Sequence, residues 1–494
     1  MSDFVLAIDC GSHAVRSIAF DVETGEAVSC GCEDLTLDFP EPGWVEIDGN
    51  AVVKQTVQVI QQAQELLDGQ GHTITALGIT NMRETAFLWD RQTGEPVAPG
   101  IMWMSGQSAP VVERWRREGL DPLIRERTGL ANESFFFGSK LAWLLEKRPD
   151  LAERARSGEL AAGTLDSWLL YKLSGGGAHL TDVSNGSRYQ LMDLRTRSWD
   201  PELAERLGIP LACLPTLCRS MGDLALTDPT VCGAEIPITG LIADQQASLL
   251  GHGCESAGAI KATFGTSGVV SLNTGGDIVL RDGLVTSVAW TDSHGVTSYE
   301  IEGSAFHSGY TVAWIDQFTG STTDRSAPMG PSPLPAEDRV YVLPSFTGIG
   351  APRWPSRRGA VIAGLAMDTV AADVIRAATE AMAFQAYDLL LAMDDALAGG
   401  KSGRIVVDGG GASSDYLCRL LAALTGDEVV RPRIQELTSL GAAKAALRGA
   451  GVDAPVDFGQ RASEAERFTP DDDLAEYGRA GFARWVDLID HNLR

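Results

Sequence analysis

The hydrophobic pattern of the first 21 residues predicts a β-hairpin. Residues 4–8 form an apolar run, a Gly-Ser turn follows at Gly11 and Ser12, and apolar and polar residues alternate on to Asp21. Alternation with a period of two is typical of a strand with one buried face. We therefore expect two antiparallel strands joined at this turn.

A second hairpin with a similar pattern is expected near the middle of the chain, at residues 262–272. Residues 11–18 and 265–272 share the pattern Gly, Ser or Thr, x, x, Val, x, Ser, Ile or Leu. Chance similarity of two hairpins is one explanation of the match, and two related domains are the other. The position of each hairpin near the start of one half of the chain favours related domains.

Elsewhere the pattern alternates between strands and helices. We expect strands at 237–242, 340–344 and 404–408, and helices at 371–398 and 416–424. Strands that alternate with helices are typical of an α/β fold. Because 494 residues exceed one ordinary core, we expect two domains, at residues 1–250 and 251–494.

Composition narrows the function classes. The net charge of −26 argues against nucleic acid as a partner. It does not exclude an anionic cofactor, because backbone amides and a metal ion can bind phosphate. The chain has no apolar run of the roughly 20 residues that a membrane helix needs, and no basic leader precedes the first strand. We expect a cytoplasmic protein with no membrane contact, whose eight scattered cysteines are reduced.

Three glycine turns offer phosphate chemistry. At Gly11-Ser12 and Gly265-Thr266, the backbone can approach a ligand closely while a hydroxyl points at phosphate oxygens. A carboxylate at the end of a buried strand, as at Asp9, is costly unless it is paired or metal-linked, and magnesium would suit it. The third turn, residues 409–411, joins a strand to a helix, an arrangement that seats nucleotides but also serves plain packing.

Eight segments, in order along nearly the whole chain, resemble the FGGY family of carbohydrate kinases, and within it the glycerol kinases. Each segment is short, and their occurrence in register makes the match specific. The segments are Asp9–Arg16, Gly78–Thr85, Trp103, Thr181–Arg188, Ala243–Ala247, Tyr299–Trp314, Pro344–Trp354 and Glu436–Ala443.

The resemblance implies an α/β fold of the actin-like ATPase (ribonuclease H-like) type, with two related α/β domains and a central cleft. It also implies an enzyme that transfers a phosphoryl group from ATP, with Mg²⁺, to a hydroxyl of a small polyol or sugar. Glycerol is the leading candidate for this small-molecule partner. A homodimer and a homotetramer are both compatible with the resemblance, and the sequence does not choose between them.

The resemblance also assigns roles to individual residues. Asp244 would be the general base that accepts the proton of the attacked hydroxyl. From the residues alone, a helix N-cap is an alternative for Asp244, and both roles can coexist. A surface ion pair is the alternative for Arg83 with Glu84, and core packing is the alternative for Trp103. The substrate residues would be Arg83, Glu84, Trp103, Phe135, Asp244 and Gln245; the nucleotide residues Ser12, His13, Arg16, Thr266, Gly309, Gly410 and Ser414; and the metal ligand Asp9.

Several positions depart from the glycerol kinase pattern. Phe135 stands where a tyrosine hydroxyl is usual, and Val269 stands where a larger phenylalanine is usual. His13 and Ala14 replace two hydroxyl residues in the first phosphate turn, and residues 104–107 lack the usual Gln-x-Arg-Arg run. Three interpretations therefore stay open: a glycerol kinase, a kinase for a four- or five-carbon polyol or ketose such as erythritol or xylulose, and a non-catalytic nucleotide-binding regulator.

Overall fold

The computed structural model describes residues 2–320, 329–354, 359–394, 396–397, 400, 402–434, 436–455, 458–459 and 465–493. It divides into two compact units. The first contains Met1–Gly253, Ser287–Tyr299 and Glu436–Gln460, and the second contains Cys254–Thr286, Glu300–Gln435 and Arg461–Arg494. The predicted division into residues 1–250 and 251–494 differs from these units, because two later segments pack with the N-terminal half.

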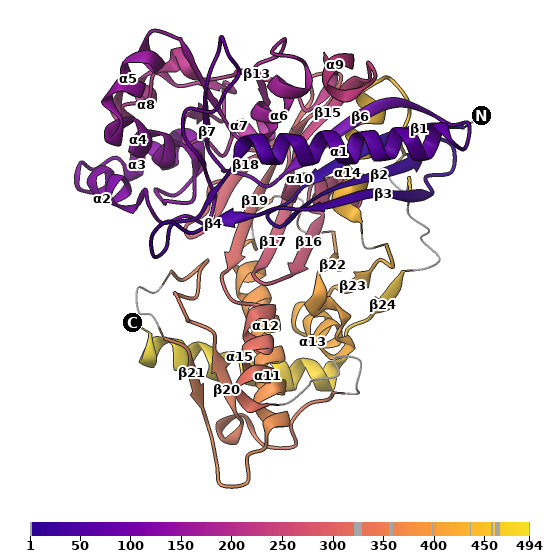
Figure 1. The fold of residues 1–494 in the computed structure, drawn as a ribbon. Helices are drawn as coiled ribbons and strands as arrows, with labels where there is room; N and C mark the ends of the chain where they lie inside the picture. Colours follow the sequence, from indigo (N-terminus) through magenta and orange to yellow (C-terminus); the bar gives the residue numbers. More distant parts are fainter. Residues whose placement is uncertain are drawn as a thin grey trace. The chain divides into compact units, whose positions relative to one another are not determined.

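The first unit is built on a mixed sheet of six strands, counted over the described residues (Figure 1). Its first hairpin is confirmed, since β1 and β2 pair antiparallel with Asp9 opposite Arg16. The strands β1, β6 and β15 run parallel, so their carboxyl ends lie along one edge. In order across the sheet they are β14 (Met221–Leu226), β15 (Pro237–Ala243), β6 (Thr73–Asn81), β1 (Asp3–Cys10), β2 (Ala14–Asp21) and β3 (Ala27–Asp34).

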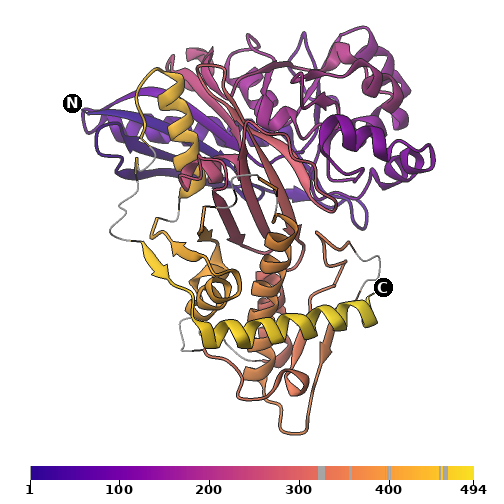
Figure 2. The ribbon, with the colours of Figure 1, turned by 180° about the vertical axis from the view of Figure 1, so that it is seen from behind.

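Helices α1 (Gly49–Asp68) and α14 (Leu437–Gly449) cover opposite faces of this sheet, as Figures 1 and 2 show from the two sides. Two glycines on the sheet let the α14 backbone approach closely. A Cβ at Gly78 would lie 2.3 Å from the carbonyl oxygen of Ala442, and a Cβ at Gly240 would lie 2.5 Å from the amide nitrogen of Ala446. Larger residues at these positions would push α14 off the sheet.

The remaining elements of the first unit are helices and short strands, and several of them form a second apolar cluster that includes Trp115, Phe137 and Leu141. None of the described helices combines the length and the apolarity needed to cross a membrane. These elements are β4 (Leu37–Asp38), β5 (Glu46–Ile47), β7 (Phe87–Asp90), β8 (Gly100–Ile101), α2 (Ala109–Arg117), α3 (Asp121–Thr128), α4 (Phe137–Lys147), α5 (Pro149–Arg156), β9 (Leu160–Gly163), α6 (Leu165–Leu173), β10 (Leu180–Asp182), α7 (Val183–Gly186), β11 (Met192–Asp193), β12 (Ser198–Trp199), α8 (Pro201–Leu207), η1 (Leu211–Cys213), β13 (Thr216–Cys218), α9 (Pro229–Cys232) and α10 (Asp244–Gly251).

The second unit carries the other predicted hairpin, in which β16 (Ile260–Phe264) and β17 (Gly268–Gly275) pair antiparallel. Its long helix α12 (Ala371–Ala392) was predicted to extend to residue 398, and residues 395 and 398 lie outside the described part. Strands β18 (Val285–Thr291) and β19 (Thr297–Ala305) each have residues in both units, because Ser287–Tyr299 belong to the first. The other elements are α11 (Gly309–Thr319), η2 (Ala336–Asp338), β20 (Tyr341–Leu343), β21 (Val361–Ala363), β22 (Arg404–Asp408), η3 (Gly410–Ser413), α13 (Asp415–Thr425), β23 (Glu428–Arg431), β24 (Glu466–Phe468) and α15 (Asp472–Asn492).

The two sheets share one topology. In the first, β1 lies between antiparallel β2 and parallel β6, and β15 continues in parallel beyond β6. In the second, β16 lies between antiparallel β17 and parallel β22, and β23 continues in parallel beyond β22. This repeated order supports the relation between the halves that the two similar hairpins predict.

Candidate active site

The carboxyl ends of three neighbouring parallel strands bring the predicted acidic residues of the first unit together. Asp9 lies at the end of β1, where it pairs with Thr80 of β6. Asn81 at the end of β6 is opposite Ala243 at the end of β15. The chain then continues from β6 into Arg83 and Glu84, and from β15 into Asp244, the first residue of α10. Ligands of α/β proteins commonly bind at such strand ends.

Arg83, Glu84 and Asp244 form one charged cluster. The Nε atom of Arg83 lies 3.4 Å from Oδ1 of Asp244 and 3.8 Å from Oε1 of Glu84. Arg83 and Glu84 are 9% and 4% exposed, so the alternative of a surface ion pair is wrong. The side chain of Asp244 keeps 28% of its surface exposed, and a ligand can therefore reach its carboxylate.

The position of Asp244 at the start of α10 is not that of an N-cap. The N-cap residue is Ala243, and Oδ1 of Asp244 accepts a hydrogen bond of 2.7 Å from the amide of Gln245. A carboxylate in the first turn of a helix is stabilised by the positive end of the helix dipole. The backbone and Arg83 thus hold the carboxylate ready to accept a hydrogen bond.

Trp103 stands beside the first glycine turn and is 36% exposed, so the alternative of core packing is wrong. Its indole Nε1 donates a hydrogen bond of 2.9 Å to Oγ of Ser12, and its amide donates one of 3.2 Å to Oγ1 of Thr85. His13 and Arg16 have exposed side chains in the same turn region. The structure therefore links a predicted substrate residue to a predicted phosphate turn.

Phe135 belongs to a short loop before α4 that a buried lysine holds in place. The ring of Phe135 packs 4.1 Å from that of Phe136. Lys140 donates from Nζ to the carbonyl oxygens of Ser134 at 3.0 Å, of Phe136 at 3.3 Å, and of Phe135. Burial lowers the pKa of Lys140 to about 7, against the charge of Glu84, which raises it. The sequence reasoning missed Lys140, although a lysine on an apolar helix face was a usable signal.

Asp9 is a partly buried carboxylate with a second carboxylate, Asp244, nearby. Burial first, and then the negative charge of Asp244, raises the pKa of Asp9 to about 7, while Arg16 lowers it. Two repelling carboxylates beside a phosphate turn suit a hard divalent cation such as Mg²⁺. Among the described residues, no group of three or more His, Cys, Asp or Glu side chains could hold a metal alone. A bound Mg²⁺ would therefore take its remaining ligands from water and phosphate.

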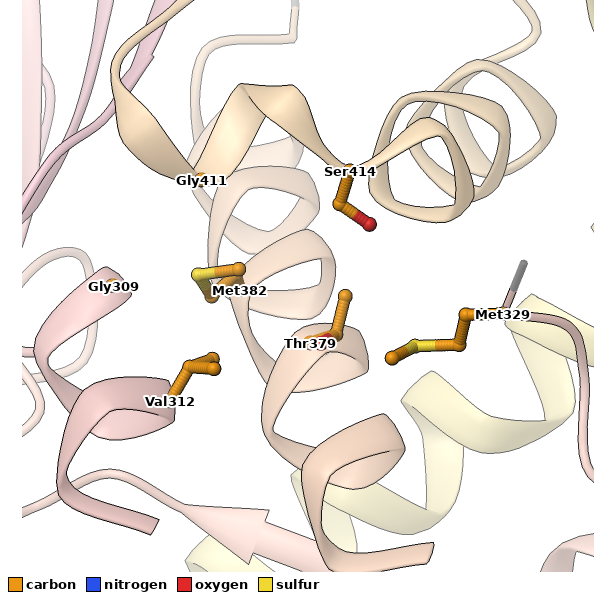
Figure 3. A pocket seen from close by; sticks show the side chains of 7 residues that line it. All are labelled: Gly309, Val312, Met329, Thr379, Met382, Gly411 and Ser414. Carbon is orange, nitrogen blue, oxygen red and sulfur yellow. The ribbon is translucent and has the colours of Figure 1, made fainter. Parts of the chain in front are cut away.

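The second unit contains a separate pocket, whose empty volume including open solvent is about 360 Å³ (Figure 3). Two residues predicted to bind nucleotide, Gly309 and Ser414, line it, and the predicted Gly410 precedes the lining residue Gly411. Gly411 belongs to the third glycine turn, whereas Val312, Thr379 and Met382 were missed because their positions on helices indicated only a core. The lining residues are Gly309, Val312, Met329, Thr379, Met382, Gly411 and Ser414.

The second glycine turn is bonded to one wall of this pocket. The amide of Gly309 donates to the carbonyl oxygen of Gly265 at 2.9 Å, and the amide of Ser308 donates to that of Thr266 at 3.1 Å. A Cβ at Gly309 would lie 2.6 Å from the Gly265 oxygen, so only glycine allows this approach. The arrangement joins an apolar pocket to backbone and hydroxyl groups, which is the chemistry of a nucleotide site.

Two further carboxylates of the first unit, Asp166 and Asp182, are fully buried. Oδ2 of Asp166 accepts from Oγ1 of Thr181 at 2.6 Å, and Oδ2 of Asp182 accepts from Oγ of Ser220 at 2.6 Å. Burial, and then the charge of Asp182, raises the pKa of Asp166 to about 7. Asp166 is thus protonated in the folded protein over a pH range in which it is ionised in the unfolded chain.

This raised pKa makes stability depend on pH in a defined direction. Between about pH 4 and pH 7 the unfolded chain loses the Asp166 proton and the folded protein keeps it, so wild-type stability falls as pH rises. Asp166→Asn replaces the titrating carboxyl group with an amide that does not titrate in this pH range. Thermal denaturation measures the unfolding midpoint of both proteins. As pH is raised from 4.5 to 7.5, we expect the midpoint of the wild type to fall relative to that of the variant. Parallel pH curves would contradict the assignment.

Comparison with known proteins agrees with this geometry. Residues 4–251 match the N-terminal domain of the FGGY family of carbohydrate kinases, and residues 260–450 match its C-terminal domain. A glycerol kinase from Rhodospirillum rubrum is 40% identical over 490 residues, which is 98% of each chain. One from Agrobacterium fabrum is 39% identical over 495 residues, covering 99% of this chain and 98% of that one.

Solved structures show the same fold. A Plasmodium falciparum glycerol kinase with ADP superposes with a TM-score of 0.91 at 24% identity, over 100% of this chain and 99% of that one. A xylulose kinase from Rhodospirillum rubrum superposes with a TM-score of 0.85 at 20% identity, over 99% and 98%. The predicted actin-like ATPase fold with two related α/β domains is confirmed. The chain belongs to the FGGY family of carbohydrate kinases.

Proposed function

We propose that this chain transfers the γ-phosphoryl group of ATP to a hydroxyl of glycerol. One observation carries the proposal: a reachable carboxylate, Asp244, is held by Arg83 beside the acceptor carboxylate of Glu84. The full-length identity of about 40% to glycerol kinases supports glycerol over other polyols.

In the proposed mechanism, Asp244 accepts the proton of the attacking hydroxyl as that oxygen bonds to the γ-phosphorus of ATP. The bond from this phosphorus to the β–γ bridging oxygen breaks, and ADP leaves. Arg83 donates to a hydroxyl oxygen of the substrate, and Glu84 accepts from a neighbouring hydroxyl. A donor and an acceptor 3.8 Å apart match the paired hydroxyls of a vicinal diol. Most of the rate enhancement then comes from positioning, as is usual in phosphoryl transfer.

The nucleotide part of the proposal rests on the apolar pocket of the second unit. Its methionine and valine side chains would take the nucleoside, and the Gly265-Thr266 turn would take phosphate oxygens. Mg²⁺, with Asp9 as its protein contact, would neutralise charge that develops on the transferring phosphoryl.

A substrate panel with coupled detection of ADP tests the proposal. We expect the highest kcat/KM for glycerol, with lower values for erythritol, xylulose and other four- or five-carbon compounds. A larger compound that exceeds glycerol would support the second candidate, whose motivating residues are Phe135, which lacks a hydroxyl, and Val269, which is smaller than the usual phenylalanine. Absence of substrate-dependent ADP release across the panel would contradict kinase activity and favour a nucleotide-binding regulator.

Phe135→Tyr should improve glycerol binding if the loop before α4 faces the substrate. A new neutral hydrogen bond contributes about 1 kcal/mol, so we expect KM for glycerol to fall about threefold to fivefold with little change in kcat. Phe318→Tyr is the matched control, because it adds the same hydroxyl to a ring that is 68% exposed near the end of α11 in the second unit. An unchanged KM in Phe135→Tyr would remove Phe135 from the substrate residues.

A further inference from the structure

The buried segment around α7 reaches both sides of the charged cluster. Oγ of Ser184 accepts from the amide of Ala243, the residue before Asp244, at 2.9 Å. The side-chain amides of Asn185 and Asn81 exchange hydrogen bonds of 3.1 and 3.2 Å. Three residues further, Arg188 donates from Nε to Oε1 of Glu84 at 2.6 Å. One short segment thus bonds to strand ends that carry the proposed base and the proposed acceptor carboxylate.

Arg188 is held rigidly in this position. It is 1% exposed, its guanidinium carbon lies 5.0 Å from the ring of Phe136, and its Nη1 donates to Oγ of Ser287 at 2.9 Å. A planar guanidinium fixed on three sides gives its Nε–H one direction. The carboxylate of Glu84 therefore accepts a hydrogen bond from a donor whose position is fixed.

Glu84 needs such a partner, because its backbone is in an unfavourable conformation. Its φ of 64° lies in the left-handed region that non-glycine residues seldom adopt. Such a conformation persists where surrounding contacts hold it, and it is common where a side chain must be aimed at a ligand. The Nε atom of Arg188 lies 2.6 Å from Oε1 of Glu84, closer than the Nε atom of Arg83 at 3.8 Å.

We propose that Arg188 is a positioning residue for substrate binding, which aims the Glu84 carboxylate at a substrate hydroxyl without touching the substrate itself. The proposal rests on the proposed function, in which Glu84 accepts that hydrogen bond. It predicts a specific kinetic pattern, because only polyol binding depends on the direction of this carboxylate. The pocket that would take the nucleoside of ATP lies in the second unit, and neither Arg188 nor Glu84 is among its lining residues.

Arg188→Lys is the test variant, since it keeps the charge and loses the planar, multiply bonded group. With the polyol that the wild type phosphorylates best, we expect KM for the polyol to rise about tenfold, KM for ATP to stay unchanged, and kcat to change less than about threefold. Arg353→Lys is the matched control, because Arg353 makes a paired contact with Asp388 at 2.6 and 2.8 Å in the second unit. We expect normal kinetics from that control.

A double-mutant cycle separates positioning from general loss of structure. In a Glu84→Gln background, where the aimed charge is gone, Arg188→Lys should raise the polyol KM no further. Independent, multiplying effects would overturn the proposal, as would equal changes in both KM values or in kcat alone. If Arg188→Lys does not fold, Ser287→Ala loosens the guanidinium more gently, and a polyol KM raised about twofold to threefold is then expected.

The two proposals fail in different ways. Absence of turnover by the wild type on every polyol would contradict the proposed function, and the positioning role with it. Wild-type turnover combined with an unchanged polyol KM in Arg188→Lys and in Ser287→Ala would contradict the positioning role alone.

Discussion

Replacing Asp244 by asparagine is expected to lower kcat about a thousandfold while nucleotide binding stays intact, since general-base catalysis contributes on the order of 10²–10⁴ in rate. The amide has almost the same shape as the carboxylate and can still accept from the Gln245 amide. It cannot take up the hydroxyl proton, and it loses the charge attraction to Arg83, 3.4 Å away. Steady-state ADP release and ATP titration of the same preparation measure the two properties.

Asp200→Asn is a matched control for this variant. Asp200 is an 8% exposed N-cap of α8 that accepts from the amides of Glu202 and Leu203 at 2.9 and 3.1 Å, and asparagine caps helices equally well. It changes the net charge by the same amount at another helix start, so normal kcat is expected. A kcat for Asp244→Asn within tenfold of the wild type would show that another group accepts the proton.

Ser414→Trp is expected to weaken ATP binding about a hundredfold, or about 2.7 kcal/mol, and to leave the KM for the polyol unchanged. Ser414 stands at the rim of the pocket in Figure 3, opposite Met329 and Thr379. An indole there would occupy space that the nucleoside needs. ATP titration by calorimetry, together with the two KM values, checks the prediction.

The control for Ser414→Trp must also remove a helix cap. Oγ of Ser414 accepts from the amide of Leu417 at 3.3 Å at the start of α13, so part of any loss could come from stability. Asp48→Trp removes a similar cap, a 2.9 Å bond from Asn50 at the start of α1, and adds the same bulk to the first unit, which contributes no lining residue to this pocket. ATP binding equal in both variants would contradict a nucleoside site at Ser414.

The elements that local pattern determines were predictable from the sequence. Both hairpins follow from apolar alternation around a glycine turn, and strand 237–242 followed by Asp244 was read from its apolar run. The helix at 371–398 was also located, because its apolar face repeats along the chain, although it ends at Ala392. These features depend on residues that are neighbours in sequence.

Contacts between distant segments were not predictable in this way. The pattern Thr181–Arg188 helped to identify the family, yet nothing in its spacing shows that Arg188 meets Glu84, 104 residues earlier. The pocket residues Thr379 and Met382 look like ordinary core positions of an amphipathic helix. The roles assigned to Ser12, His13, Arg16, Gln245 and Thr266 stay predictions until ligand binding to these residues is measured.

The packing of α14 against the first sheet has a consequence for synthesis of the protein. The six strands of that sheet have been synthesised by residue 243, but the helix that covers one face spans Leu437–Gly449. While roughly 200 further residues are synthesised, the face of the sheet at Gly78 and Gly240 stays exposed to solvent. Chaperones or other nascent chains can then bind its apolar residues. The first half of the gene, expressed alone, therefore encodes a sheet that lacks the helix α14 on one face, and not a domain that can fold by itself.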